Sequence, residues 1–315
     1  MKLRIDDVRI LADGIKAFRL VDPGGAELPE FSPGAHVDLR LGNGLIRQYS
    51  LCGDPADRHG YMLGVLREAA GDGGSTYIHD ELGVGAMVET STPRNNFKLV
   101  AAPRYLFVAG GIGITPILPM LRAARRSGAD FRLFYCTRSP ERTAFREELL
   151  AEGGDGSVVI HHDGGDPARG LDFAALLAVR EPGTQLYYCG PPGLMTAIAA
   201  ACRHWPADAV HCEHFSARPK EARAETPQNQ AFRVRIAGSG AEYEVPVDQT
   251  IVNVLRRNGV TVDTSCEDGY CGTCMTRYTA GEPEHRDTVL DAESRRSYVL
   301  ICCARSKTPV LELDI

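Results

Sequence analysis

The sequence predicts a multidomain fold with an antiparallel β-barrel, an α/β domain built on a parallel sheet, and a small C-terminal α+β domain. Three observations support this prediction. Short strands separated by Gly, Pro and Asp turns fill residues 1–102, strands alternate with helices over residues 103–225, and a cysteine-rich loop lies within residues 226–315. The length of 315 residues is sufficient for two or three domains of ordinary size.

The first segment contains many short strands. Val37–Leu41 and Tyr61–Leu66 are two of them, and Asp22–Gly25 and Ser32–Gly34 supply turns. Short strands at close spacing are typical of an antiparallel barrel. We therefore predict a β-barrel over residues 1–102.

In the second segment, apolar strands alternate with helical periodicity. Tyr105–Ala109 is a continuous apolar strand that ends in glycines, and Ile117–Ser127 follows with a helical period. The alternation continues through strands Phe131–Tyr135, Val158–Ile160 and Gln185–Cys189, and through helices near Ala144–Ala151 and Leu194–Arg203. This pattern predicts a parallel, doubly wound sheet, which binds ligands at the carboxyl ends of its strands.

A polar stretch at residues 216–230 precedes the third segment. It contains almost nothing to bury, so we predict a linker there. Beyond it, Phe232–Ile236 and Glu242–Val247 predict a hairpin, and Ile251–Asn258 predicts a short helix before the cysteine loop. We therefore predict a separate α+β domain over residues 226–315.

The composition argues against several classes of function. A net charge of −6 disfavours a nucleic-acid partner, and no apolar run approaches the roughly 20 residues of a membrane span. The first residues lack the apolar core of a secretory signal, so we expect a cytoplasmic location. In a reducing compartment, the ten cysteines indicate metal or redox chemistry rather than disulfides.

Four cysteines form the most specific motif. Cys266, Cys271 and Cys274 follow the spacing Cys-x4-Cys-x2-Cys and Cys302 follows at a distance, which is the pattern of a plant-type [2Fe–2S] ferredoxin. Soft, anionic thiolates suit iron and sulfide. Zinc is the alternative occupant, although zinc sites usually take paired and shorter cysteine spacings. Cys303 adjoins Cys302, so only one of the two is expected to be the fourth ligand.

Other residues of this loop suit the same site. Gly269 and Gly272 let the backbone curl tightly and direct N–H groups toward the sulfurs, which helps to set the reduction potential. Glu267 and Asp268 are acids that could contribute to a docking surface, although exposed acids are usually only solvated.

A second set of residues suits a flavin. Arg47 can pair with a phosphate, Tyr49 offers a flat face to an isoalloxazine ring, and the Ser50 hydroxyl can bond a ring nitrogen. The turn Gly71–Ser75 precedes a helical stretch at Tyr77–Glu81, and glycine N–H groups at a helix start bind phosphate. Each motif alone is weak, because surface strands often end in Arg and Tyr and Gly-Gly-Ser turns are common.

Two strand-to-helix loops suit a dinucleotide. Ala109–Pro116 contains glycines that let the backbone approach a pyrophosphate, with Thr115 as the expected N-cap and Pro116 as the first helical residue. The loop departs from G-x-G-x-x-G, since Pro116 stands at the third glycine. Cys189–Gly193 is a second loop, which should lie at the same edge of the sheet. Cys189 by itself would be interpreted as a packing residue at the end of a strand.

Taken in this order, the motifs resemble those of the phthalate dioxygenase reductase family, which includes vanillate O-demethylase reductases. The resemblance covers essentially the whole chain. The matching segments are Arg47–Ser50 and Gly73–Ser75 for the flavin, Gly110–Pro116 and Cys189–Pro191 for the nicotinamide, the Glu-x-Phe segment Glu213–Phe215, and the C-terminal cysteines.

The resemblance implies FMN rather than FAD, NADH as the electron donor, and a β-grasp-like ferredoxin domain. It implies FMN contacts from Arg47, Gln48, Tyr49, Ser50, Val65, Leu66, Arg67, Gly73, Gly74, Ser75, Thr115 and Phe215. It implies NADH contacts from Gly110, Gly111, Gly113, Thr137, Arg138, Cys189, Gly190, Pro191 and Met195. The residues implied at the reacting atoms are Ser50, Thr115, Cys189 and Phe215.

The resemblance also bears on two open choices. The family's last cysteine stands in an Ile-Cys-Val-Ser-Arg-like context, and alignment with Ile301–Arg305 selects Cys302 as the fourth ligand. The second choice is between NADH and NADPH. The second strand of the α/β domain is followed by Arg138, Arg142 and Arg146, at the place where the 2′-phosphate of NADPH would bind. The alternative interpretation is that these arginines form a solvated helix face.

The expected function is that of the reductase component of a multicomponent oxygenase. Hydride would pass from NADH to FMN, and single electrons would pass through the cluster to a separate terminal oxygenase, of the Rieske non-haem-iron type, in aromatic catabolism. His161–His162 is interpreted as a polar strand end, since no ligand pair of Rieske type is present in this chain. Two alternatives remain: a reductase for a cytochrome P450, and an electron-relay subunit that does not itself oxidise NADH.

Overall fold

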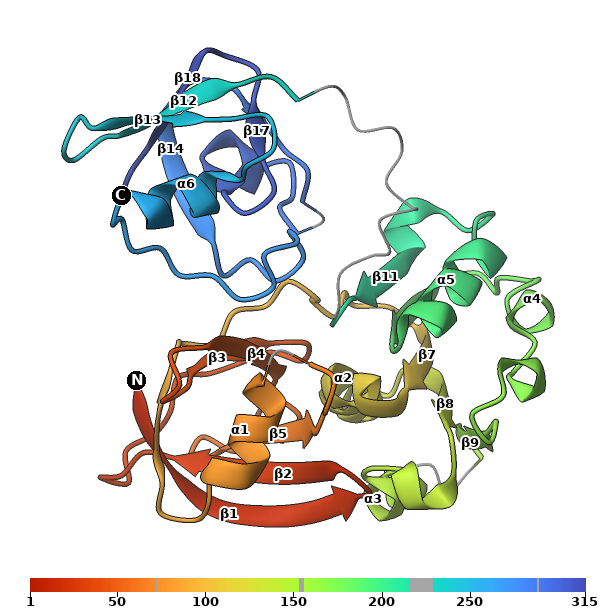
Figure 1. Ribbon diagram of the computed structural model, residues 1–315. Helices are drawn as coiled ribbons and strands as arrows, with labels where there is room; N and C mark the ends of the chain where they lie inside the picture. The colour runs from red at the N-terminus through yellow and green to blue at the C-terminus, as the bar shows by residue number, and fades with distance from the viewer. Residues whose placement is uncertain (72, 153–155, 216–228, 288) are drawn as a thin grey trace. The chain divides into compact units, whose positions relative to one another are not determined.

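The computed structural model describes residues 1–71, 73–152, 156–215, 229–287 and 289–315, and it forms two compact units, Met1–Phe215 and Ser216–Ile315 (Figure 1). The first unit contains a six-stranded antiparallel sheet and a five-stranded parallel sheet, and the second contains a five-stranded mixed sheet and a two-stranded ribbon. The predicted fold classes are confirmed. All but the last two residues of the predicted linker lie outside the described residues.

The antiparallel sheet curls into a barrel around an apolar interior. Its strands follow the order β4-β3-β6-β1-β2-β5, and a bridge between Leu51 and Leu63 joins its two edges. Side chains such as Val37 and Leu39 fill the interior, because alternate residues of a strand point to the same face. The elements are β1 (Lys2–Ala12), β2 (Ile15–Val21), β3 (His36–Arg40), β4 (Ile46–Ser50), β5 (Tyr61–Leu66), α1 (Gly74–Glu81) and β6 (Met87–Thr90).

The parallel sheet follows the order β11-β10-β7-β8-β9, and each strand is parallel to its neighbours. Helix α2 packs in the apolar cluster on one face, and α4 and α5 pack in the cluster on the other face. This is the predicted doubly wound arrangement. The elements are β7 (Arg104–Gly110), η1 (Gly111–Gly113), α2 (Ile114–Ser127), β8 (Asp130–Thr137), η2 (Pro140–Arg142), α3 (Arg146–Glu152), β9 (Val158–His162), η3 (Pro167–Arg169), α4 (Phe173–Leu176), β10 (Thr184–Cys189), α5 (Pro192–Ala201), η4 (Ala207–Ala209) and β11 (Val210–Glu213).

The barrel and the parallel sheet share one apolar cluster. Ile15 and Cys52 of the barrel region belong to the same buried cluster as Ile117 of α2. A Cβ on Gly64 of β5 would lie only 2.8 Å from Thr115 Cγ2, so the barrel wall contacts the start of α2 closely. The predicted boundary between residues 102 and 103 therefore crosses a continuous core.

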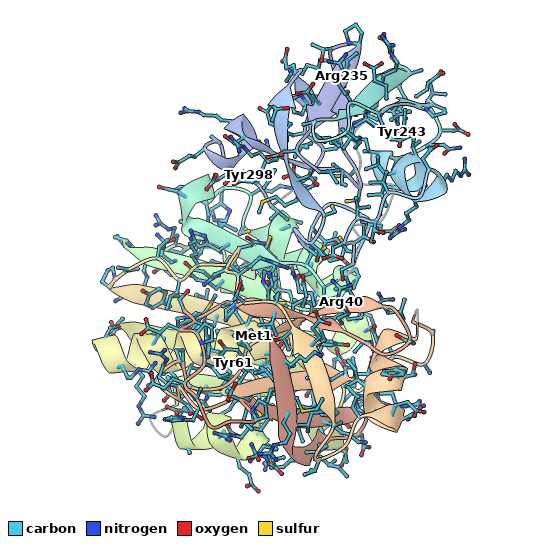
Figure 2. All side chains as sticks on the ribbon, turned by 90° about the vertical axis from the view of Figure 1, so that its left-hand side faces the viewer. Met1, Arg40, Tyr61, Arg235, Tyr243 and Tyr298 are labelled. Carbon is cyan, nitrogen blue, oxygen red and sulfur yellow. The ribbon has the colours of Figure 1, made fainter. Side chains whose placement is uncertain are left out.

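The second unit is built on the sheet β13-β12-β18-β14-β16, which packs against α6. Strand β12 is antiparallel to β13 and parallel to β18. Arg235, labelled in Figure 2, pairs with Glu242 on β13 and with Glu312 on β18. The elements are β12 (Phe232–Ile236), β13 (Glu242–Val245), α6 (Ile251–Arg257), β14 (Met275–Ala280), β15 (Pro283–Glu284), η6 (Ser294–Arg296), β16 (Tyr298–Leu300), β17 (Arg305–Ser306) and β18 (Val310–Leu313).

The start of α2 differs from the prediction. The helix begins at Ile114 and its N-cap is Gly113, so the expectation that Thr115 caps the helix and Pro116 opens it is wrong. The glycine loop winds into the 3-10 turn η1 and runs directly into the helix. Thr115 Oγ1 is then free to donate to the carbonyl of Ile112 at 2.9 Å.

Arg305 stabilises the second unit from its interior. Its guanidinium is buried and donates to the carbonyls of Gln249 at 2.6 Å, Gln230 at 2.7 Å and Pro246 at 3.0 Å. We expect Arg305→Met to lower the free energy of unfolding of this unit by about 3 kcal/mol, because buried carbonyls lose their donors. Urea denaturation of the full chain, followed through the visible absorbance of the second unit, measures the change.

Lys307→Met is the matched control for this substitution. Lys307 lies two residues further along and pairs with Glu282 at the surface. Exposed ion pairs contribute little, so we expect a much smaller loss than in Arg305→Met. Equal losses from the two substitutions would contradict the role given to Arg305.

Candidate active site

The end of β4 meets the start of α1 in the barrel. A Cβ on Gly74 would lie 2.6 Å from Arg47 Cγ, so the arginine side chain passes directly over the glycine turn. Gly73 caps α1 with a φ of 81°, in the left-handed region that favours glycine. The structure thus brings the Arg47 side chain and the N–H groups of Gly73–Ser75 together, as a phosphate site requires.

Three other residues predicted to contact the flavin are Val65, Leu66 and Arg67, and two of them already make contacts within this region. Val65 is buried and its carbonyl accepts from His79 Nε2 at 2.8 Å, and Arg67 pairs with Asp80 at 2.9 Å. Leu66 is half-buried. Flavin contacts from these three residues stay predictions.

Two residues of β4 remain accessible beside Arg47. Gln48 and Tyr49 are half-buried. Burial raises the pKa of Tyr49, so its phenol keeps its proton over the physiological range. The side chain can therefore offer a neutral aromatic face.

The two glycine loops of the parallel sheet contact each other. A Cβ on Gly113 would lie 2.2 Å from the carbonyl oxygen of Cys189, and a Cβ on Gly110 would lie 2.7 Å from Pro191 Cδ. A Cβ on Gly190 would lie 3.0 Å from Gly110 Cα. The loops that follow β7 and β10 therefore meet at the carboxyl edge of the sheet, as predicted, and the close approach requires glycine.

A hydrogen bond connects the barrel to this edge. Ser50 Oγ, at the end of β4, donates to Glu213 Oε2 at 3.3 Å, and Glu213 is the register partner of Cys189 in the parallel pair of β11 and β10. Burial of the carboxyl raises the pKa of Glu213 to about 8, and burial of the thiol raises the pKa of Cys189 well above its usual value. Glu213 thus links Ser50 to the strand end that carries Cys189, and Thr115 contacts Gly64 of β5.

Glu213 is absent from the residues predicted for the site. The resemblance includes Glu213 in the Glu-x-Phe segment but implies a role only for Phe215, whose side chain is 40% exposed at the end of the first unit. The signal that could have identified Glu213 is its position at the end of a strand in the sheet, level with Cys189.

Three of the other predicted NADH residues lie outside the two glycine loops, and Gly111 lies within the first of them. Thr137 ends β8 and its hydroxyl bonds Thr143 Oγ1 and His162 Nδ1, both at 2.8 Å. Arg138 is exposed next to it, and Met195 is buried in the apolar cluster under α5. Gly111 opens η1 with a φ of 52°. Their roles stay predictions.

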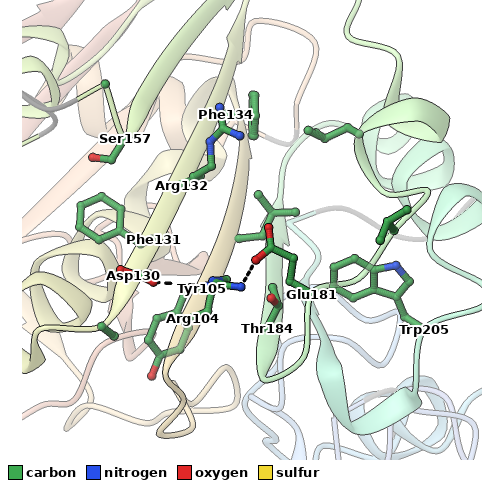
Figure 3. A pocket seen from close by; sticks show the side chains of 15 residues that line it. Arg104, Tyr105, Asp130, Phe131, Arg132, Phe134, Ser157, Glu181, Thr184 and Trp205 are labelled. Atoms are coloured by element: carbon green, nitrogen blue, oxygen red, sulfur yellow. Dashed lines mark hydrogen bonds and ion pairs between the residues drawn. The ribbon is translucent and has the colours of Figure 1, made fainter.

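A pocket of about 510 Å³ lies at the opposite, amino edge of the parallel sheet (Figure 3). The starts of β7, β8 and β10 contribute to its wall. Arg104 in this wall already pairs with Asp130 at 3.4 Å and with Glu181. The pocket is therefore separate from the predicted nucleotide edge, and the site rests on the glycine loops.

The four predicted cluster ligands come together in the second unit. The thiol of Cys302 hydrogen-bonds those of Cys266 and Cys274, and Cys266 also bonds Cys271. The backbone N–H of Asp268 donates to Cys266 Sγ at 3.4 Å. Hydrogen bonds from Cys271, from Cys302 and from the loop backbone hold the pKa of Cys266 below its usual value.

The loop geometry fits a cluster held by thiolates. Gly269 and Gly272 adopt φ values of 80° and 78°, which let the loop curl so that backbone N–H groups point toward sulfur. Over the described ranges, no three His, Cys, Asp or Glu side chains converge as a site for one metal ion. The thiols form a chain of contacts in the order Cys271, Cys266, Cys302 and Cys274.

Cys302 and Cys303 have different surroundings. Cys302 is buried against two other thiols of the motif. Cys303 is half-buried, its Sγ lies 2.6 Å from the position that a Cβ on Gly269 would take, and its thiol donates to the carbonyl of Leu300 at 3.7 Å. The geometry favours Cys302 as the fourth ligand.

The acid proposed for docking beside the cluster is already paired. Glu267 Oε1 lies 2.7 Å from Arg256 Nη1 and accepts from Thr264 Oγ1 at 2.8 Å. An exposed pair of this kind presents little net charge to a partner. A docking role for Glu267 and Asp268 stays a prediction.

The raised pKa of Glu213 predicts a pH-dependent stability. Between pH 4.5 and pH 8 the folded chain keeps a proton that the unfolded chain releases, so this carboxyl increasingly destabilises the folded state as the pH rises through that window. We expect Glu213→Gln to flatten this fall in stability and to gain up to about 4 kcal/mol at pH 8. Urea denaturation at a series of pH values measures this; parallel curves for the two proteins would contradict it.

Among the described residues, no helix has the length and apolar character needed to cross a membrane.

Comparisons with known proteins identify the family of this chain. Residues 234–307 match the family model of the 2Fe-2S iron-sulfur cluster binding domain. The reductase subunit of tert-butanol monooxygenase / tert-amyl alcohol desaturase from Aquincola tertiaricarbonis is 47% identical, over 100% of this chain and 96% of that protein.

Two solved structures extend the match to the whole fold. A phthalate dioxygenase reductase, described as a modular structure for electron transfer from pyridine nucleotides to [2Fe–2S], is 41% identical with a TM-score of 0.74, over 100% of this chain and 98% of that one. An intact type IV self-sufficient cytochrome P450 monooxygenase is 38% identical with a TM-score of 0.88, over 100% of this chain and 41% of that one. The chain belongs to the phthalate dioxygenase reductase family and is an NADH-dependent oxidoreductase that uses FMN and a [2Fe–2S] cluster.

Proposed function

We propose that this chain supplies electrons to a Rieske non-haem-iron oxygenase in the cytoplasm. Its relatives are reductase subunits that serve oxygenase components, and the names of two of them specify a monooxygenase and a dioxygenase. The single structural observation that supports the first step of this electron path is the contact of Ser50 with Glu213. It joins the flavin strand of the barrel to the nicotinamide edge of the parallel sheet within one compact unit.

The cofactors supply the redox chemistry when bound: hydride transfer from NADH to FMN, and single-electron transfer through the cluster. The residues of the barrel bind the flavin and orient it. Arg47 and the N–H groups of Gly73–Ser75 would hold the phosphate of FMN, Tyr49 would offer its aromatic face to the ring, and the Ser50 hydroxyl would supply a hydrogen bond to it.

The residues of the parallel sheet position the nicotinamide. The glycine loops after β7 and β10 admit the pyrophosphate, because their backbones carry no side chains at the closest points. Cys189 and Thr115 flank the reacting carbon as neutral, buried groups, and Glu213 keeps a proton at Ser50 below about pH 8. Phe215, exposed at the end of the unit, would cover the flavin ring when no nicotinamide is bound.

The cluster ligands are Cys266, Cys271, Cys274 and Cys302, and the chain is organised as three functional segments. These are the FMN-binding segment 1–102, the NADH-binding segment 103–225 and the ferredoxin segment 226–315. The packing of the four thiols and the match over residues 234–307 support the third.

A cytochrome P450 is the second candidate acceptor. The observation that favours it is the similarity of this whole chain to 41% of a self-sufficient P450 monooxygenase. Reconstitution of the chain with a purified Rieske oxygenase and, separately, with a P450 distinguishes the two. We expect NADH-driven product formation coupled to NADH consumption only with the Rieske oxygenase; coupled turnover with the P450 alone would overturn the choice.

A further inference from the structure

Three charged or ionisable side chains lie together behind the cysteine loop. His285 and Asp287 follow β15, and Arg295 lies in η6. The side chain of Asp287 is fully buried, whereas those of His285 and Arg295 are 14% and 40% exposed. The flavin and nicotinamide sites make no use of them.

Their contacts centre on the Asp287 carboxylate. Asp287 Oδ2 accepts from the backbone N–H of Val289 at 3.1 Å and of Leu290 at 2.8 Å, and Arg295 Nη2 lies 3.5 Å away. Arg295 Nη2 also donates to the backbone carbonyl of Asp287 at 3.1 Å. The carboxylate is therefore fixed in position, with a guanidinium as its near counter-charge.

Hydrogen bonds among the described residues do not satisfy every polar atom of His285, Asp287 and Arg295. Asp287 Oδ1, His285 Nδ1 and Arg295 Nε are buried and have no hydrogen-bond partner among the described residues. His285 Nδ1 lies 3.6 Å from Asp287 Oδ1, and burial lowers the pKa of His285, so the imidazole is neutral at physiological pH. The formal charges of the cluster are those of Asp287 and Arg295.

Asp287 packs directly against the ligand loop. A Cβ on Gly269 would lie 3.4 Å from Asp287 Cα, and Gly269 stands between the ligands Cys266 and Cys271. Cys303, which follows Cys302, lies against the same position, with its Sγ 2.6 Å from that Cβ. A charge at Asp287 therefore acts on the loop through protein rather than through water, where screening is weak.

We propose that Asp287 and Arg295 are positioning residues that set the reduction potential of the [2Fe–2S] cluster through opposing charges. The inference rests on the cluster site assigned above. A reduced cluster carries one more negative charge, so a nearby carboxylate disfavours reduction and a nearby guanidinium favours it. The pair holds the potential at an intermediate value.

The test is a redox titration of the full holoprotein with dithionite, followed by the EPR signal of the reduced cluster. We expect Asp287→Asn, which keeps an acceptor for the two N–H groups, to raise the midpoint potential. We expect Arg295→Gln to lower it. Each change should be roughly tenfold in the equilibrium constant for reduction, which is about 59 mV for a one-electron couple.

Neighbouring exposed residues provide matched controls. Arg296→Gln removes the adjacent, exposed arginine, and Glu293→Gln removes an exposed acid from the same segment. Solvent screens both charges, so the midpoint potential of the cluster in each control variant should equal that of the parent protein. Arg295→Lys keeps the positive charge, so its midpoint potential should lie close to that of the parent protein.

Shifts of opposite sign in the midpoint potentials of the two variants distinguish an electrostatic role from a structural one. Shifts of the same sign in Asp287→Asn and Arg295→Gln, or no shift in either, would overturn the proposal. If Asp287→Asn does not fold, Arg295→Gln decides alone: a lowered potential supports the proposal and an unchanged one overturns it. Dithionite reduction needs neither NADH nor an oxygenase, so the result does not depend on the identity of the acceptor, and a parent protein without the EPR signal would refute the cluster site instead.

Discussion

Cys302→Ala is expected to abolish the [2Fe–2S] absorbance and EPR signals, whereas Cys303→Ala retains them. Cys302 is buried and its thiol contacts those of Cys266 and Cys274, so its loss removes the ligand that closes the site. Cys303 instead packs on Gly269 and donates to the Leu300 carbonyl. Purified variants, assayed for iron, sulfide and the EPR signal after reduction, give the comparison.

Flavin content is the internal control for this pair. The barrel belongs to the first compact unit, so both variants should retain FMN and NADH-dependent ferricyanide reduction by the flavin. Loss of the cluster only in Cys303→Ala would show that the fourth ligand had been assigned to the wrong neighbour. Loss in both variants would show that the turn at residues 300–304 tolerates neither change.

Gly113→Ala is expected to reduce NADH-dependent ferricyanide reduction by about 100-fold. The new Cβ would lie 2.2 Å from the carbonyl oxygen of Cys189, so the two loops at the carboxyl edge must separate. Displacements of about 1 Å in a positioned site cost this much. Gly113 has a φ of −62°, which alanine adopts readily, so the effect is steric rather than conformational. Stopped-flow reduction by NADH measures the flavin step directly.

Gly193→Ala is the matched control. Gly193 lies in the second loop region, at the start of α5, and a Cβ there would meet nothing within 4 Å. We expect near-parent rates. An equal loss in both variants, or a Gly113→Ala enzyme with parent rates, would refute the claim that the close approach of these loops positions the nicotinamide.

Local sequence patterns are sufficient to predict the layout of the chain. Continuous apolar strands such as Tyr105–Ala109 specify a buried parallel sheet, and its strand ends must share one edge. The two glycine loops that follow such strands are therefore expected at the same edge, and the structure shows their contact. Arg47 and the turn Gly73–Ser75 are likewise predicted to share one phosphate site, and the arginine side chain does lie over the turn.

The details that were predicted wrongly or missed depend on contacts between distant segments. Thr115 has the side chain of a helix cap, but the glycines before it allow a 3-10 turn, which moves the cap to Gly113. Glu213 lies 163 residues from Ser50, and no local pattern reports that pairing. The burial of Asp287 is likewise set by how its loop packs on Gly269.

Anaerobic titration of the isolated holoprotein with NADH tests the central claim most directly. If one chain carries electrons from NADH through FMN to the cluster, the flavin and the cluster absorbance should both bleach as NADH is added, and the EPR signal of the reduced cluster should appear in step. A flavin that is reduced while the cluster stays oxidised would contradict the account.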